Sequence, residues 1–198
     1  TYDAGPRPTS LAIGDFNDDH MPDIVTTNLL ANTVSVLRGE NTGFFARLPP
    51  DPTGAGPVSV TAALLNGDSD LDLVITRANS KADVLFGDGH FYFNTGGTYG
   101  VGSSPVASAV ADIDGDGDLD IFVVNQNSNS VSVLLNDGIG GFGNGNNYRV
   151  GASPTDVIAV DVNEDDSLDL VITTSGDDNV SVLLGDGRGG FEPVITTL

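Results

Sequence analysis

The chain has 198 residues, of which 28 are acidic and seven basic, so its formal charge is −21. So few cationic side chains argue against nucleic acid and anionic lipid as partners, because phosphate groups are bound through Lys and Arg. The absence of cysteine excludes thiolate zinc sites and cysteine nucleophiles, and the apolar runs are far too short for membrane insertion. The length suffices for one compact domain with a substantial core.

Four copies of one unit make up the chain. Two markers recur every 48 or 49 residues, namely an aspartate that ends an acidic loop and a proline ahead of that loop, and each unit also carries a later turn in which glycine precedes phenylalanine. The aspartates are Asp23, Asp72, Asp120 and Asp169, and the prolines are Pro8, Pro57, Pro105 and Pro154. We therefore predict a single domain over residues 1–198, with repeats at approximately 5–50, 51–101, 102–150 and 151–198.

Each unit has the pattern of strands throughout. In the third unit, Ser108–Ala111 leads into the acidic loop, the β-branched run Ile121–Asn125 follows it, and the alternating run Val131–Leu135 comes after a polar turn. A weaker fourth strand closes that unit near Tyr148–Val150, and no stretch has a useful helical period. Four short antiparallel strands per repeat are typical of a β-propeller blade, whereas a two-sheet sandwich would not need a 49-residue repeat.

The sequence thus predicts an all-β fold, a β-propeller of four-stranded antiparallel blades. Thr1 and Tyr2 align with Asn147 and Tyr148, at the end of the fourth strand of the third unit. The N-terminal residues would therefore complete the outer edge of the last blade and close a ring of four. The alternative is part of a seven- or eight-bladed ring, continued by further chain or completed by self-association.

The acidic loops carry oxygen side chains at positions 1, 3, 5 and 9. A calcium ion takes six to eight oxygen ligands, which alternating acidic residues in a tight loop supply, whereas Mg²⁺ prefers octahedral sites that retain water. We expect position 7 to offer a backbone carbonyl, because its side chain differs between copies. The predicted Ca²⁺ ligands are Asp112, Asp114, Asp116, Asp118 and Asp120 in the third loop, Asp15, Asn17, Asp19, Met21 and Asp23 in the first, and Asp161, Asn163, Asp165, Ser167 and Asp169 in the fourth.

The second loop departs from this pattern, since Leu64 stands where the first ligand should be. Its remaining candidate ligands are Asn66, Asp68, Asp70 and Asp72, and whether this loop binds a metal stays open. Acidic turns that merely face solvent would explain one such loop, because Asp, Asn and Gly favour turns. They do not explain three loops with oxygens in the same register.

No catalytic residue is predicted, and we expect the chain not to be an enzyme. His20 and His90 lie at unrelated positions of the repeat, so neither a zinc site nor a Ser-His-Asp triad is indicated. Paired carboxylates for glycosidic chemistry stay open in so acidic a chain, although the loops account for most of the acids.

The pattern Asp-x-Asp/Asn-x-Asp-Gly-x-x-Asp, followed by a Val/Ile strand and a Gly-Phe turn before Gly-x-x-Pro, resembles the FG-GAP/VCBS repeat family. The integrin α-subunit propeller is its best-known member. The resemblance covers essentially all 198 residues and departs at Leu64. It implies a propeller of seven or eight blades, often in a secreted or cell-surface protein, with Ca²⁺ in the loops between the first and second strands.

We expect the acidic loops and the Gly-Phe turns to share one end of the blades, with variable loops rich in Asn and Ser at the other end. Variable loops on a rigid scaffold are where binding tends to reside. The leading hypothesis is a secreted or cell-surface, adhesion-type module that binds a protein or glycan ligand on the face opposite the acidic loops, with structural Ca²⁺. Lectin-like carbohydrate binding is a second hypothesis, and a domain of a polysaccharide-active enzyme is a third.

Overall fold

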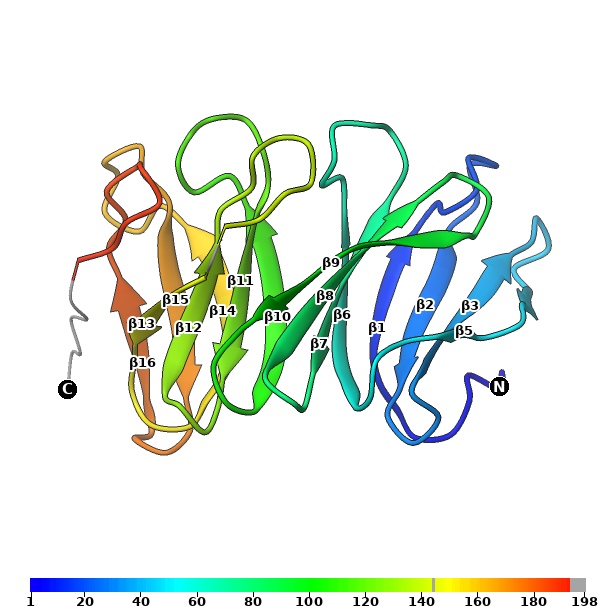
Figure 1. Ribbon diagram of the computed structural model, residues 1–198, viewed down its shortest axis with the longest axis horizontal. Coiled ribbons are helices and arrows are strands. Elements are labelled where there is room, and N and C mark those ends of the chain that lie inside the picture. Colours follow the sequence, from blue (N-terminus) through cyan, green and yellow to red (C-terminus); the bar gives the residue numbers. More distant parts are fainter. Residues whose placement is uncertain (144, 193–198) are drawn as a thin grey trace.

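The computed structural model describes residues 1–143 and 145–192 and shows four antiparallel sheets side by side (Figure 1). The first blade contains β1 (Pro8–Gly14), β2 (Asp23–Asn28), β3 (Thr33–Gly39), β4 (Phe45–Arg47) and β5 (Asp51–Pro52). The second contains β6 (Pro57–Ala63), β7 (Asp72–Arg77), β8 (Lys81–Gly87) and β9 (Phe93–Gly100). The third contains β10 (Pro105–Ala111), β11 (Asp120–Asn125), β12 (Ser130–Leu134) and β13 (Asn146–Arg149). The fourth contains β14 (Pro154–Val160), β15 (Asp169–Thr174) and β16 (Asn179–Leu183).

The predicted all-β fold with antiparallel blades is confirmed, and the described residues contain no helix, so none that is long and apolar enough to cross a membrane. Two blades differ in detail from four regular strands. In the first, the outer strand is broken into β4 and β5, which both pair with β3. Pro49 and Pro50 lie between them, and proline has no N–H to donate to a ladder. In the fourth, the predicted outer strand lies outside the described residues.

The recurring prolines have a structural role. Each is the first residue of the innermost strand of its blade, where a missing N–H costs no central ladder bond. In all four blades the pairing register shifts directly after this proline, as between Pro105 and Ala107. The proline therefore marks where each new blade starts.

Packing between successive blades forms the core. One apolar cluster joins the first and second blades, another the second and third, and another the third and fourth. At the last of these junctions Phe122 and Val131 of the third blade pack with Leu170 and Ile172 of the fourth, and all four are fully buried. A blade with a neighbour on each side is apolar on both faces, which is why all six residues of β11 are buried.

The four blades form an open row. The first and fourth blades lie at opposite ends of the molecule, so they do not close a ring of four on each other (Figure 1). Tyr2 packs against Phe45 of the first blade, with ring centroids 5.5 Å apart. The expectation that Thr1 and Tyr2 complete the fourth blade is therefore wrong for this arrangement.

The Tyr2–Phe45 contact is the first of a series. Tyr99 of the second blade packs on Phe142 of the third, and Tyr148 of the third packs on Phe191 of the fourth, both edge to face. In each of these pairs the tyrosine comes from the outer strand of the preceding blade. Tyr2 thus occupies the place that the outer strand of a blade before the first would fill.

The two ends of the blades differ as predicted. The acidic loops, which join β1 to β2, β6 to β7, β10 to β11 and β14 to β15, lie at the same end as the Gly-Phe turns (Figure 1). The turns between the second and third strands of each blade lie at the opposite end, together with the links between blades. We call these the acidic end and the variable-loop end.

Candidate metal sites

The ninth-position aspartates are fully buried in all four blades. In the third loop, Asp120 Oδ2 accepts a hydrogen bond from the Ile113 N–H at 3.0 Å, and Oδ1 accepts one from the Asn136 N–H at 2.8 Å. The same pair of bonds recurs at Asp23, Asp72 and Asp169. Each aspartate therefore ties the start of its acidic loop to the end of the third strand.

Burial is costly for these carboxylates. It raises the pKa of Asp72 and of Asp120 to about 6, even though the two backbone N–H bonds act in the opposite direction. The sequence pattern predicted the ninth position only as a metal ligand, and its hydrogen-bonding role was not predicted. One signal was present, because Asp72 is kept in the loop that has Leu64 in place of the first ligand.

The first-position aspartates organise the loop backbone. Asp112 Oδ1 accepts from the N–H groups of Gly115 and Asp116, at 2.8 and 3.1 Å, and Oδ2 accepts from Gly117 N–H at 2.9 Å. Asp15 and Asp161 are used in the same way. These bonds wrap the chain around one carboxylate, so the later oxygen side chains of the loop face it.

This wrapping requires a left-handed backbone at positions 4 and 6. The third loop meets it with Gly115 and Gly117, at φ values of 75° and 98°. The other two loops use non-glycine residues with φ between 58° and 66°, namely Asp18, His20, Glu164 and Asp166. Such residues adopt this conformation at an energetic cost, which indicates that the loop geometry is imposed by its contacts.

The second loop is built differently. Leu64 is 45% exposed and offers no acceptor, and only Gly67 has a positive φ, at 81°. The position-6 residue, Ser69, has no left-handed backbone. Asn66 still donates to Asp68 at 2.7 Å, and Asp68 accepts from the Asp70 N–H at 2.9 Å. The hydrogen bonds among positions 3, 5 and 7 are therefore kept, but those that a first-position carboxylate accepts in the other loops are lost.

Positions 3 and 5 distinguish the third loop from the others. Carboxylate oxygens of Asp112, Asp114 and Asp116 all lie within 4.8 Å of one another. Burial raises the pKa of Asp114, and the charges of Asp116 and Asp112 raise it further. In the fourth loop, by contrast, the Asn163 amide donates to Asp165 at 2.8 Å and lowers the pKa of that carboxyl group. The third loop thus concentrates uncompensated negative charge.

The donor set fits a hard cation of the size of Ca²⁺. All side-chain candidates at positions 1, 3 and 5 are carboxylate or amide oxygens, which Ca²⁺ prefers. In the first loop, Asn17 Oδ1 is buried and has no hydrogen-bond partner within the described chain. A buried oxygen without a partner costs free energy, and a cation held by Asp15, Asn17 and Asp19 would supply that partner.

The main chain at position 7 is hydrogen-bonded to the carboxylate at position 5. The N–H groups of Met21, Asp118 and Ser167 donate to the position-5 carboxylates Asp19, Asp116 and Asp165, at 2.8 to 2.9 Å. The main chain at position 7 therefore runs next to the carboxylate cluster, where its carbonyl is available as a ligand.

Asn136, which no sequence pattern indicated as a functional residue, connects the acidic loops of two blades. Its Nδ2 donates to the Leu65 carbonyl of the second loop at 2.9 Å and to the Leu119 carbonyl of the third loop at 3.1 Å. A cavity of about 320 Å³ lies beside it, with Asp68 and Asp118 in its lining. Order in one acidic loop is therefore linked to the packing between blades.

Solved structures with a similar fold have low sequence identity to the chain. BBS1N, solved in complex with ARL6DN, is 12% identical over 98% of the chain, with a TM-score of 0.67. The biofilm matrix protein Bap1 of V. cholerae is 17% identical over 97%, with a TM-score of 0.59. A Bacteroides uniformis protein provisionally assigned as a 6-phosphogluconolactonase is 14% identical over 97%, with a TM-score of 0.71. The chain spans 56%, 28% and 55% of these three structures, respectively.

A sequence comparison with curated proteins gives no match. The model of the FG-GAP-like repeat matches three times, at residues 15–75, 65–123 and 112–172. Each match starts at or near the beginning of one acidic loop and extends past the next, so the matched unit includes both loops, the later strands of one blade and the first strand of the next. The chain belongs to the FG-GAP-like repeat family.

Proposed function

We propose that the chain is a Ca²⁺-stabilised β-propeller segment that acts as a non-catalytic interaction module, at the cell surface or outside the cell, and binds a protein or glycan partner at its variable-loop end. The observation that carries the proposal is the common construction of the first, third and fourth acidic loops. All three wrap their backbone around a first-position carboxylate and gather oxygen donors beside it.

In this proposal the metal is structural. Bound Ca²⁺ supplies positive charge that offsets the repulsion between carboxylates such as those of Asp112, Asp114 and Asp116. The chain itself supplies the frame, because the buried ninth-position aspartates fix each loop to its own blade, and Asn136 links the third loop to the second. Repulsion in a chain of charge −21 further favours cation binding.

The stability of the protein tests the metal hypothesis. At 1 mM Ca²⁺, we expect three sites with dissociation constants of about 10⁻⁴ to 10⁻³ M to add roughly 1–4 kcal/mol to the free energy of unfolding. This corresponds to a rise in Tm of about 5 °C over the protein in EDTA, measured by differential scanning calorimetry. Asp112→Ala should reduce the number of ions bound in isothermal titration calorimetry from three to two. An identical Tm with Ca²⁺ and EDTA would refute the metal hypothesis.

Two structural neighbours support an interaction role. BBS1N is a propeller-like fold in complex with another protein, and Bap1 is a component of a biofilm matrix. At these identities the likeness to the B. uniformis protein concerns the fold and carries no activity to this chain. We place the partner at the variable-loop end because the acidic end is occupied by the loops that would hold the metal.

We also propose that the exposed faces of the first and fourth blades are covered by further propeller blades. On the first blade Leu11 is 60% exposed, whereas its counterpart in the second repeat, Val60, is buried. On the fourth blade Ile158 and Val180 are exposed, whereas the counterpart of Val180 in the third blade, Val131, is fully buried. Both end faces are thus the same kind of surface that the internal blades bury against each other. The similar structures, of which this chain spans 55–57%, have length for such blades.

Self-association of the isolated chain tests this arrangement. We expect the 20.3 kDa chain to form dimers or larger assemblies at about 100 µM, because apolar faces of this kind associate in water. The variant Leu11→Glu/Ile158→Glu should be monomeric with an unchanged Tm, since both side chains are exposed in the single chain. Light scattering coupled to gel filtration measures both. A wild-type monomer at this concentration would contradict the proposal.

A further inference from the structure

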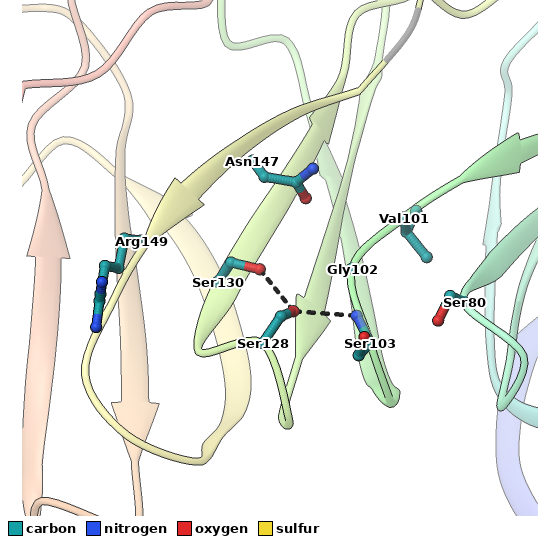
Figure 2. A pocket seen from close by; sticks show the side chains of 8 residues that line it. All are labelled: Ser80, Val101, Gly102, Ser103, Ser128, Ser130, Asn147 and Arg149. Carbon is teal, nitrogen blue, oxygen red and sulfur yellow. Dashed lines mark hydrogen bonds between the residues drawn. The ribbon is translucent and has the colours of Figure 1, made fainter.

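A polar pocket of about 590 Å³ lies at the variable-loop end, between the second and third blades (Figure 2). The turn between β7 and β8 contributes Ser80, and the link between the blades contributes Val101, Gly102 and Ser103. The third blade contributes the remaining lining residues, namely Ser128, Ser130, Asn147 and Arg149. Residues from four separate segments thus converge on one hollow.

Hydrogen bonds fix the wall of this pocket. Ser128 Oγ accepts from the Ser103 N–H at 3.0 Å and lies 2.9 Å from Ser130 Oγ (Figure 2). The Gly102 N–H donates to Ser132 Oγ at 3.1 Å, and a Cβ at position 102 would lie only 2.4 Å from Ser128 Oγ. The close approach of the two segments therefore requires glycine here, and the pocket is preformed.

Several polar groups in the pocket remain available. Ser132 Oγ donates a hydrogen bond to the side-chain carbonyl oxygen of Asn147. The NH₂ group of Asn147 and the hydroxyls of Ser80 and Ser103 make no hydrogen bond within the described residues. These groups can donate and, in the case of the hydroxyls, also accept. A ligand that carries several hydroxyl groups matches such a set.

Arg149 adds a positive charge at the margin of the pocket (Figure 2). Three other arginines of the chain, Arg38, Arg47 and Arg77, have a carboxylate within 4.0 Å. Arg149, like Arg7 and Arg188, has none among the described residues, although the chain has 28 acidic side chains. A guanidinium group binds a carboxylate through two parallel hydrogen bonds, and its long side chain can turn over the pocket to do so.

We propose that this pocket binds a sugar acid, a hexuronic acid unit whose carboxylate pairs with Arg149 and whose hydroxyls bond to Ser80, Ser103 and Asn147. A single guanidinium matches a single negative charge, and the charge of −21 disfavours a more highly charged group such as a phosphate dianion. The free hydroxyl and amide groups favour a sugar over an acidic peptide side chain, which would use only the guanidinium. The inference rests on the proposed binding role of the variable-loop end.

Three small probes separate the parts of this proposal. Methyl glucuronoside carries both a carboxylate and sugar hydroxyls. Methyl glucoside carries the hydroxyls alone, and N-acetylglutamate amide carries the carboxylate alone. With Ca²⁺ saturating, we expect the glucuronoside to shift the amide signals of Ser80, Ser103 and Asn147 in ¹H–¹⁵N spectra. It should bind at least tenfold more tightly than either other probe. Equal binding of the glucoside would overturn the role of the carboxylate, and preferred binding of the glutamate derivative would overturn the sugar.

Variants locate the site. Arg149→Gln should weaken glucuronoside binding at least tenfold, and Arg149→Lys should weaken it less, because lysine keeps the charge but loses the paired hydrogen bonds. Arg188→Gln, which removes the same charge from a turn at the acidic end, should bind as the wild type does. Unchanged affinity of Arg149→Gln, or no binding of the glucuronoside to a protein whose Tm still rises with Ca²⁺, would overturn the pocket proposal alone. A missing Ca²⁺ response with intact glucuronoside binding would instead count against the metal hypothesis.

Discussion

Asp120→Asn is expected to lower the free energy of unfolding by about 3 kcal/mol or more, because two buried N–H groups then compete for one amide oxygen. Asp120 is 0% exposed and accepts from the N–H groups of Ile113 and Asn136. In the variant, an NH₂ group faces one of these donors. The loop that holds Asp112, Asp114 and Asp116 would lose its attachment to β12 at the same time. Urea unfolding at pH 7, followed by circular dichroism, measures the change.

Asp118→Asn is the matched control for this substitution. It removes the same charge from the same loop, but the predicted contribution of position 7 is a backbone carbonyl, so the side-chain carboxylate is not required. We expect it to change the stability by less than about 0.5 kcal/mol. If both variants unfold at the same urea concentration in EDTA, the buried hydrogen bonds of Asp120 have no special role, and the ninth position is only a metal ligand.

The repeat pattern made the fold predictable from the sequence. The spacing of Asp23, Asp72, Asp120 and Asp169 defines the blades, and the Val/Ile runs fall on the strands because each blade buries both faces against its neighbours. The place of the acidic loops also followed, since they join the first two strands of every blade. The broken outer strand at Pro49 and Pro50 was not predicted, although the missing N–H groups of these prolines are a signal for it.

The structural roles of the buried acidic side chains were less predictable from the sequence. An aspartate that binds a metal and one that accepts two buried N–H bonds look the same in a sequence, so the buried role of Asp120 and its counterparts required the structure. The role of Asn136 depends on carbonyls of two different blades, 17 and 71 residues away. The pocket with Arg149 likewise depends on the approach of two blades, which no local pattern encodes.

The second large expected effect concerns a polar pair on the second and third strands of the blades, whose residue types differ between repeats. In the first and third blades a buried asparagine donates to a serine, as Asn125 does to Ser132 at 2.8 Å. The counterparts in the second blade are Arg77 and Asp83, which form an ion pair at 2.8 Å with side chains only 12% and 11% exposed. Asp83 also accepts from Thr98 Oγ1, at 2.7 Å.

Removing one member of this ion pair should lower the free energy of unfolding more than replacing both members. Arg77→Asn leaves the Asp83 carboxylate buried without its cation, and Asp83→Ser leaves the guanidinium without its anion. We expect each single variant to lose about 3–5 kcal/mol of unfolding free energy. The double variant Arg77→Asn/Asp83→Ser recreates the neutral pair that the neighbouring blades already accommodate, so it should regain most of that loss. Urea unfolding of the four proteins gives the coupling energy, and losses that simply add would show that the two side chains act independently.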